Sequence, residues 1–252
     1  RNFMKVLASV APSLLTLACT RHVGRARLLL AARPRGGAAA MFDTAAANPL
    51  LEQAGLPRFD RIEPADVKPA MATILEQLES DFDKLETRLA ACDPATLKYG
   101  DVVEALEKVE APVEYAWGIV GHLMGVKNGD ELRAAHGEVQ PAVIQTTTKL
   151  SQSLAIYRAI EAVAASDGAL DDAQRRVLDA SLQSMRLSGV ALEGQPKEQF
   201  NANRMELADI STKFSNHVLD ATKAWTLTLT DQSDVDGLPP SALAAAAERA
   251  RA

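Results

Sequence analysis

Apolar side chains recur every three or four positions along most of this chain, and no other feature of the sequence constrains its fold as strongly. Between residues 64 and 91 this spacing places them on one face of a helix. The face consists of Val67, Met71, Ile74, Leu75, Leu78, Phe82, Leu85 and Leu89. Pro64 suits the first turn of a helix, and Asp93-Pro94 ends the pattern. The sequence therefore predicts one long amphipathic helix over residues 64–91.

Two further helices are expected before residue 167. One begins near Tyr99-Gly100-Asp101, and Pro112 is expected to kink or break it, because an interior proline costs roughly 3 kcal/mol. Asn128-Gly129-Asp130 provides a turn and an N-cap. After this turn the apolar spacing predicts a single long helix that ends at Ser166-Asp167-Gly168.

The remaining residues predict four more elements with different patterns. A fourth helix is expected over about 171–187, and a fifth, the longest, over about 197–223. Apolar residues of the fifth helix follow near-heptad spacing and are expected to face inward. They are Phe200, Leu207, Ile210, Phe214, Val218, Ala221 and Trp225. Trp225 to Thr230 alternates apolar and threonine residues, which is typical of a short half-buried strand. Ser241 then caps a last helix that runs to residue 252 without a stop signal.

Composition agrees with a mainly α fold. The 252 residues are 47% hydrophobic but only 4% aromatic, whereas Ala, Leu and Glu are abundant, which favours helices over a β-sandwich. A chain of this length can bury one sizeable core. We therefore expect long antiparallel helices packed along their lengths, with one short strand near 225–230.

Charge is distributed unevenly along the chain. Residues 1–42 contain seven Lys or Arg and no acidic residue, although the whole chain has a net charge of −6. An acid-free head rich in Arg, Ala and Leu is typical of an organellar transit peptide, which predicts a mitochondrial or chloroplast protein. A rival interpretation takes Val6–Ala18 as the apolar part of a secretory signal. Translation from Met41 would instead remove the basic head and give a cytoplasmic product.

The acidic body that follows residue 42 makes nucleic acid and anionic membranes unsuitable partners, because both require clustered positive charge. In addition, no apolar stretch is long enough to span a bilayer. Neither kind of partner is expected.

The histidines offer the first candidates for chemistry, at His22, His122, His136 and His217. A zinc hydrolase typically carries two His four positions apart with a Glu between them, and no two of these have that spacing. We interpret His122 and His136 as structural. His217 and Asp220 share one face of a predicted helix, but a capping or surface hydrogen bond explains this pair more simply.

Other residues give no catalytic signal either. Cys19 and Cys92 are too few for a disulfide framework, and Cys92 is expected to pack at the end of an apolar helix. Asp171-Asp172 is interpreted as acidic charge at a helix N-terminus. The G-x-S-x-G, G-x-x-x-x-G-K and G-x-G-x-x-G motifs are missing from the sequence. We assign no catalytic residue and no metal ligand, and leave substrate-binding residues open.

Several ordered segments nevertheless resemble one family of enzymes. They are Asn48-Pro-Leu-Leu, RIEPADVKPAM at 61–71, HLMGVKNGDELRAAH at 122–136, RRVLDASLQSMRLSGVAL at 175–192, FSNHVLDATKAWTLTLTD at 214–231 and GLPPSALAAAA at 237–247. Together they resemble the N-terminal region of the oligopeptidase A and thimet oligopeptidase family of zinc metallopeptidases, in particular its organellar branch.

This resemblance implies a two-lobed, monomeric enzyme whose deep channel admits short unstructured peptides such as released presequences. It implies a zinc ion held by an H-E-x-x-H helix and a further Glu. The sequence contains no H-E-x-x-H, and none of its Glu residues can be assigned as the further ligand. Residues 64–252 are then expected to be the N-terminal helical lobe, truncated before the catalytic region, and residues 43–63 an extended segment that leads into it. This chain is expected to be inactive without the zinc motif. The alternative is a non-catalytic helical module that binds peptides or partners.

Overall fold

The computed structural model describes residues 48–251, except for 54, 167 and 169, and in this part of the chain every regular element is a helix. The mainly α prediction is therefore confirmed. Contacts divide the described chain after Ala208, within its longest helix, so residues 48–208 and 209–251 are described separately. The basic head, with His22, Cys19 and the predicted transit peptide, lies outside the described residues.

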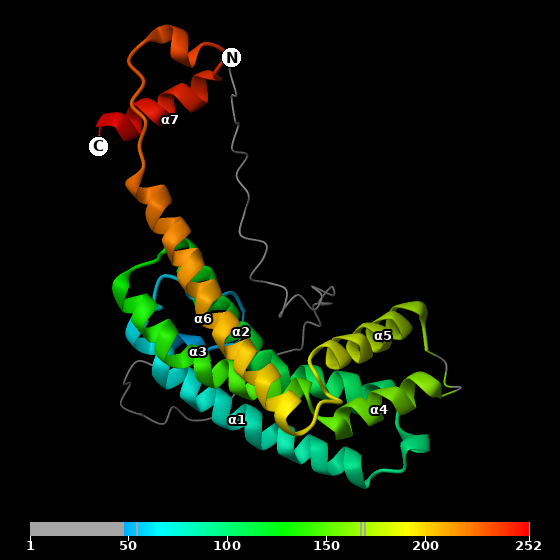
Figure 1. The fold of residues 1–252 in the computed structure, drawn as a ribbon. Helices are drawn as coiled ribbons and strands as arrows, with labels where there is room; N and C mark the ends of the chain where they lie inside the picture. Colours follow the sequence, from blue (N-terminus) through cyan, green and yellow to red (C-terminus); the bar gives the residue numbers. More distant parts are fainter. Residues whose placement is uncertain (1–47, 54, 167, 169, 252) are drawn as a thin grey trace, which may run out of the picture. The chain divides into compact units, whose positions relative to one another are not determined.

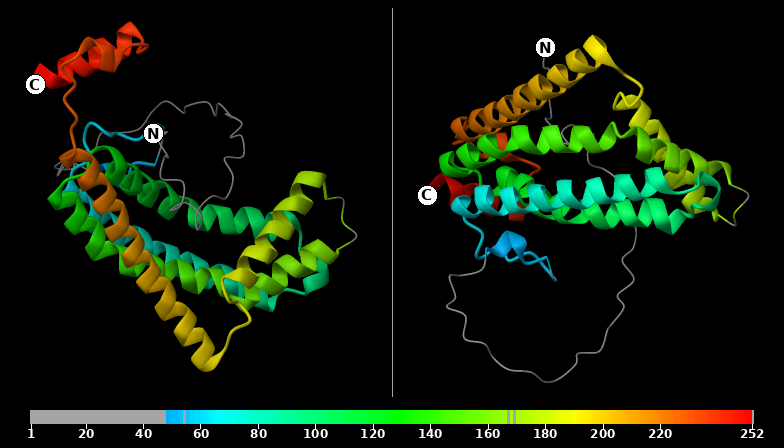
Figure 2. Two further views of the ribbon diagram at one scale, coloured as in Figure 1. Left: turned by 45° about the horizontal axis from the view of Figure 1, so that its top comes forward. Right: turned by 90° about the horizontal axis from the view of Figure 1, so that it is seen from below.

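Three long helices, α1 (Pro64–Ala91), α2 (Ala105–Val126) and α3 (Asp130–Ser151), run side by side as the centre of residues 48–208 (Figures 1 and 2). α1 packs on both of the others and contributes nine buried side chains, more than any other helix, including Met71 and Phe82. Its bounds agree with the prediction. The start of α1 is held by the Glu63 backbone N–H, which donates to the Asp66 carboxylate at 2.9 Å.

Polar contacts show that α1 and α3 run parallel. Four hydrogen bonds connect the two segments, and the residue numbers of both partners increase in the same order. The pairs are Lys68 with Glu138, Glu79 with Thr146, Asp83 with Lys149 and Glu86 with Ser153. α2 runs antiparallel to α1, since the end of α1 at Arg88 donates to the carbonyl of Asp101, just before α2 begins. An up–down–up bundle of this kind forms a rigid slab of helices.

α2 is not broken at Pro112, where the sequence predicted a kink or a break. The helix continues through this proline from Ala105 to Val126, after a π-helical turn at Gly100–Glu104. Leu106 lies before the proline and Val113 and Ala116 after it, and all three are buried in the same core. Burial on both sides keeps the two segments aligned, and this tertiary packing overrides the local cost of the proline.

The single helix predicted from residue 130 to 166 is also wrong. The chain breaks at Gln152-Ser153, and α4 (Leu154–Ala165) starts there with the Ser153 hydroxyl accepting from the Ile156 N–H at 3.2 Å. α5 (Asp172–Leu187) packs on α4, so the two form a pair beside one end of the slab (Figure 1). Asp171 caps α5 as its charge suggested, accepting from the Gln174 N–H at 2.8 Å.

The longest helix, α6 (Gly194–Ala224), matches the predicted element closely but not the predicted burial. None of its residues is buried, whereas the near-heptad stripe was expected to face inward. The predicted strand is wrong as well: residues 225–230 have no strand assignment, because a strand requires a partner and the described residues provide none. A last helix, α7 (Pro240–Arg251), follows a short 3-10 turn at Gln232–Val235. None of the helices among the described residues is long and apolar enough to cross a membrane.

Candidate functional site

The three described histidines have different surroundings. His136, on α3, is 8% exposed and its ring stacks on Trp117 of α2, with centroids 4.6 Å apart and planes at 19°. Burial lowers the pKa of His136, since an imidazolium would be poorly solvated there. Its Nδ1 has no hydrogen-bond partner among the described residues. His136 is thus placed as a neutral, packed ring.

His122 and His217 are both exposed. His122 makes a tilted ring contact with Phe59, with centroids 5.4 Å apart. His217 and Asp220 lie on the exposed surface of α6, and no third ligand-type residue joins them. Cys92 lies at the C-terminal end of α1, half-buried against the core.

No three His, Cys, Asp or Glu side chains are grouped to hold a metal ion anywhere in residues 48–251 that the structure describes. These residues do not fit the zinc centre that the resemblance implies. This part of the chain therefore provides no ligand set for metal chemistry.

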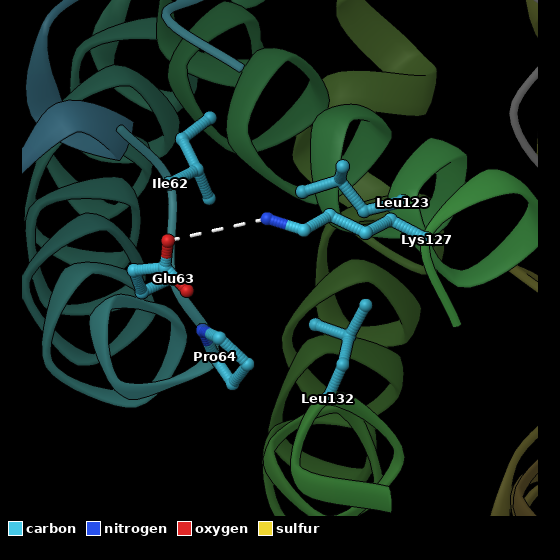
Figure 3. A pocket seen from close by; sticks show the side chains of 6 residues that line it. All are labelled: Ile62, Glu63, Pro64, Leu123, Lys127 and Leu132. Atoms are coloured by element: carbon cyan, nitrogen blue, oxygen red, sulfur yellow. Dashed lines mark ion pairs between the residues drawn. The ribbon is translucent and has the colours of Figure 1, made fainter. Parts of the chain in front are cut away.

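Two small hollows open on residues 48–208. One lies between the start of α1, the end of α2 and the start of α3 (Figure 3). Lys127 Nζ lies 3.9 Å from Glu63 Oε1 at this hollow, and the other lining residues are Ile62, Pro64, Leu123 and Leu132. Its volume of about 30 Å³ has room for roughly one water molecule. The other, of about 110 Å³, lies beside Arg175 and Asp179 of α5. Both are far smaller than the several hundred Å³ typical of ligand sites.

A polar junction at Gln152-Ser153, between α3 and α4, connects these two helices to α1, to α6 and to the end of α5. The Gln152 side-chain N–H₂ donates to the Ser188 carbonyl at 2.9 Å and to Asn201 Oδ1 of α6 at 2.8 Å, while Ser153 donates to the Glu86 carboxylate of α1. Gln152 and Ser153 are both buried, so these bonds replace lost water contacts. The sequence analysis missed this junction because Leu150 and Leu154 keep helical spacing across it. Serine three residues before Ile156 was the available signal for a cap.

Arg204 of α6 belongs to the same region. Its guanidinium donates to Ser151 Oγ at 3.4 Å, and burial lowers its pKa. The Gln140 side chain of α3 donates to the Ala208 carbonyl of α6 at 3.4 Å. The first half of α6 is therefore attached to α3 by polar contacts.

Exposed apolar side chains recur along residues 209–229. On α6, Ile210, Phe214 and Val218 recur every four residues, and Phe214 is 66% exposed. Beyond the helix, Trp225, Leu227 and Leu229 alternate with threonines, and Trp225 is 70% exposed. We name these six residues the apolar surface. Patches of this kind on soluble proteins mark interaction sites.

Comparison with known proteins identifies the class to which the helical slab belongs. The family model of the neurolysin/thimet oligopeptidase N-terminal domain matches residues 71–197, and the chain belongs to this family. The chain is 40% identical over 210 residues to "Probable cytosolic oligopeptidase A" of Arabidopsis thaliana, covering 82% of this chain and 29% of the relative.

Two further relatives show the same relation. "Organellar oligopeptidase A, chloroplastic/mitochondrial" of Arabidopsis thaliana is 37% identical, with 82% of this chain and 26% of the relative covered. "Oligopeptidase A" of Escherichia coli is 30% identical, with 81% and 30% covered. The resemblance found in the sequence is confirmed, and the chain spans less than a third of the length of these relatives.

Proposed function

We propose that residues 64–252 form the N-terminal helical lobe of a zinc-dependent oligopeptidase that cleaves short unstructured peptides, such as released presequences. The observation that carries this proposal is the 40% identity over 82% of the chain to a relative named oligopeptidase A. Zinc ligands and the general base would come from polypeptide outside the described residues. The lobe would contribute binding and exclusion rather than bond cleavage.

The packing of residues 48–208 supports the proposal that this lobe forms one wall of a channel. α1, α2 and α3 bury a continuous core along their lengths, which makes the slab rigid. A rigid wall limits a channel by size, and it also keeps bulk water from a metal centre that such a channel encloses. Folded proteins would thereby be excluded, whereas extended peptides would enter.

Peptide hydrolysis provides the test. The chain by itself, with zinc added, is expected to leave a quenched fluorescent peptide intact. Joined to the part of the Arabidopsis cytosolic relative that lies outside the 210 matched residues, it is expected to hydrolyse the same peptide until a chelator is added. Chelator-sensitive hydrolysis by the chain alone would contradict the proposal, and so would a folded chimera without hydrolysis.

A second candidate function is a non-catalytic helical module that binds peptides or partners. The exposed apolar surface on residues 209–229 favours it, since such a surface can bind without any chemistry. An in-frame H-E-x-x-H encoded beyond Ala252 in the transcript would favour the enzyme, whereas a stop codon at that point would favour the module.

Location and assembly are proposals too. We propose import into mitochondria or chloroplasts, because residues 1–42 are basic and acid-free and one relative is named as organellar. A reporter fused to residues 1–45 is expected to enter an organelle, and a diffuse cytosolic signal would contradict this. We further propose that the enzyme acts as a monomer, which sedimentation of the chimera would check.

A further inference from the structure

The apolar surface has two parts with different backbone geometry. Ile210, Phe214 and Val218 present a ridge along α6, because residues four apart lie on one side of a helix. Trp225, Leu227 and Leu229 lie on a segment without helix or strand assignment. All six side chains are exposed.

The segment from 226 to 230 also offers its backbone. None of its N–H groups takes part in the turn, loop and cap hydrogen bonds found among the described residues, although the Trp225 N–H still donates to Ala221 at 3.2 Å. Alternating threonine and apolar residues have high β-propensity. Such a segment forms a strand when a second strand is supplied to pair with it.

Two facts indicate what covers this surface. The match to the N-terminal domain family ends at residue 197, and the apolar surface begins shortly after it. The relatives are more than three times as long as the matched region, so they contain a large further polypeptide. A surface at the border of an N-terminal domain is positioned to meet the polypeptide that follows that domain.

We propose that the apolar surface is the docking site for the further polypeptide of the oligopeptidase, with α6 inserting its ridge into an apolar groove and residues 225–230 pairing as a strand. This inference rests on the proposed function, because its occupant is the remainder of the peptidase. A second copy of this chain, residues 1–47 and residues 48–208 are the other possible occupants, and the experiment separates them.

The experiment uses the full chain, alone and in the chimera with the Arabidopsis cytosolic relative. Phe214→Asp and Leu227→Asp each place a charge on the apolar surface. Val126→Asp and Leu187→Asp are matched controls, because these side chains are 67% and 73% exposed on residues 48–208. Melting temperature, sedimentation and peptide hydrolysis are measured for every variant.

In the chimera, Phe214→Asp and Leu227→Asp are each expected to lower the melting temperature by about 1–2 °C relative to the controls, since a given loss of free energy shifts melting less in a long protein than in a small domain. We also expect them to reduce hydrolysis roughly tenfold, as loss of about 1.4 kcal/mol of docking would do. In the isolated chain the same variants are expected to shift the melting temperature by less than about 1 °C, since the six side chains of the apolar surface are exposed in the described part of the chain. The two controls should be neutral in both proteins.

Four results would overturn the inference. In the chimera, they are surface variants that behave like the controls, or a wild-type protein whose two parts melt separately. In the isolated chain, they are destabilisation by Phe214→Asp, or a dimer that Phe214→Asp dissociates while the chimera is unaffected. The third and fourth would assign the surface to the chain itself or to a second copy.

The outcomes also separate this inference from the proposed function. If the chimera hydrolyses peptide and the surface variants leave its melting and hydrolysis unchanged, the proposed function stands and the docking site is rejected. A chimera that melts cooperatively and responds to the surface variants, yet hydrolyses nothing in the presence of zinc, retains the docking site and removes the function.

Discussion

Two phenylalanines on long helices show how differently the two regions of this chain use apolar residues. Phe82 of α1 is completely buried in the core of residues 48–208, whereas Phe214 of α6 is 66% exposed on residues 209–251. Both follow the same helical spacing in the sequence. Periodicity therefore defines which face of a helix is apolar, and packing among the residues that the structure describes accounts for only one of the two faces.

Truncation of the two phenylalanines should give the largest contrast. Phe82→Ala is expected to lower the free energy of unfolding by about 3–5 kcal/mol, since it leaves a cavity in a closed core. Phe214→Ala is expected to change it by less than about 0.5 kcal/mol in the isolated chain. Urea denaturation of the two variants measures both values. Comparable losses at the two positions would show that residues 209–251 are packed as tightly as the core.

Substitution of Gln152 at the polar junction should give the second largest loss of free energy of unfolding. Gln152→Ala removes the donors to the Ser188 carbonyl and to Asn201 Oδ1, and leaving these half-buried acceptors without a donor is expected to cost about 1 kcal/mol. Gln199→Ala is the matched control, because Gln199 also donates to an asparagine, at 2.8 Å, but on the exposed surface of α6. Denaturant melts of both variants are the measurement, and equal effects would contradict a structural junction at Gln152.

Protonation of His136 is expected to have a smaller and pH-dependent effect. Burial holds the pKa of His136 below the ordinary value of about 6.5, so the unfolded chain binds this proton more readily. Its contribution to stability is complete above pH 6.5 and is lost as the pH falls from there through the lower folded pKa. The loss cannot exceed about 1.4 kcal/mol per pH unit for one proton.

His136→Phe provides the comparison for this effect, because it keeps a ring against Trp117 but cannot titrate. Stability measured from pH 7.5 to 5 should fall less steeply in this variant than in the wild type. His122→Phe, at an exposed position, is the matched control for replacing a histidine by phenylalanine. Identical slopes for the wild type and His136→Phe would exclude a role for His136 in the acid response.

The accuracy of the sequence-based predictions depended on where the deciding contacts lie. α1 has its start and stop signals, Pro64 and Asp93-Pro94, next to it in the sequence, and both of its ends were predicted. The break at Gln152-Ser153 depends on Glu86, Ser188 and Asn201, which lie far away in the sequence. Local spacing therefore gave no indication of this break, and the helix was predicted to continue.

The candidate site shows the same limit. Alternation from Trp225 to Thr230 indicated extended backbone, but a strand also requires a neighbour, which these six residues do not specify. The near-heptad stripe of α6 identified its apolar face and not the element that packs there. His217 and Asp220 are three residues apart, a spacing that can bring a metal ligand and a carboxylate together on a helix. They lie on the surface, and no third ligand-type group joins them among the described residues.

Hydrogen exchange of residues 225–230 is the most direct test of the central claim, that this chain is a lobe completed by further oligopeptidase polypeptide. In the isolated chain the amides of α1 should exchange slowly, while those of residues 226–230 should exchange at close to the unprotected rate. In the chimera with the Arabidopsis cytosolic relative, residues 226–230 should become protected by at least about tenfold, as strand pairing requires. Fast exchange of these amides in a folded, active chimera would contradict the claim, as would full protection in the isolated chain.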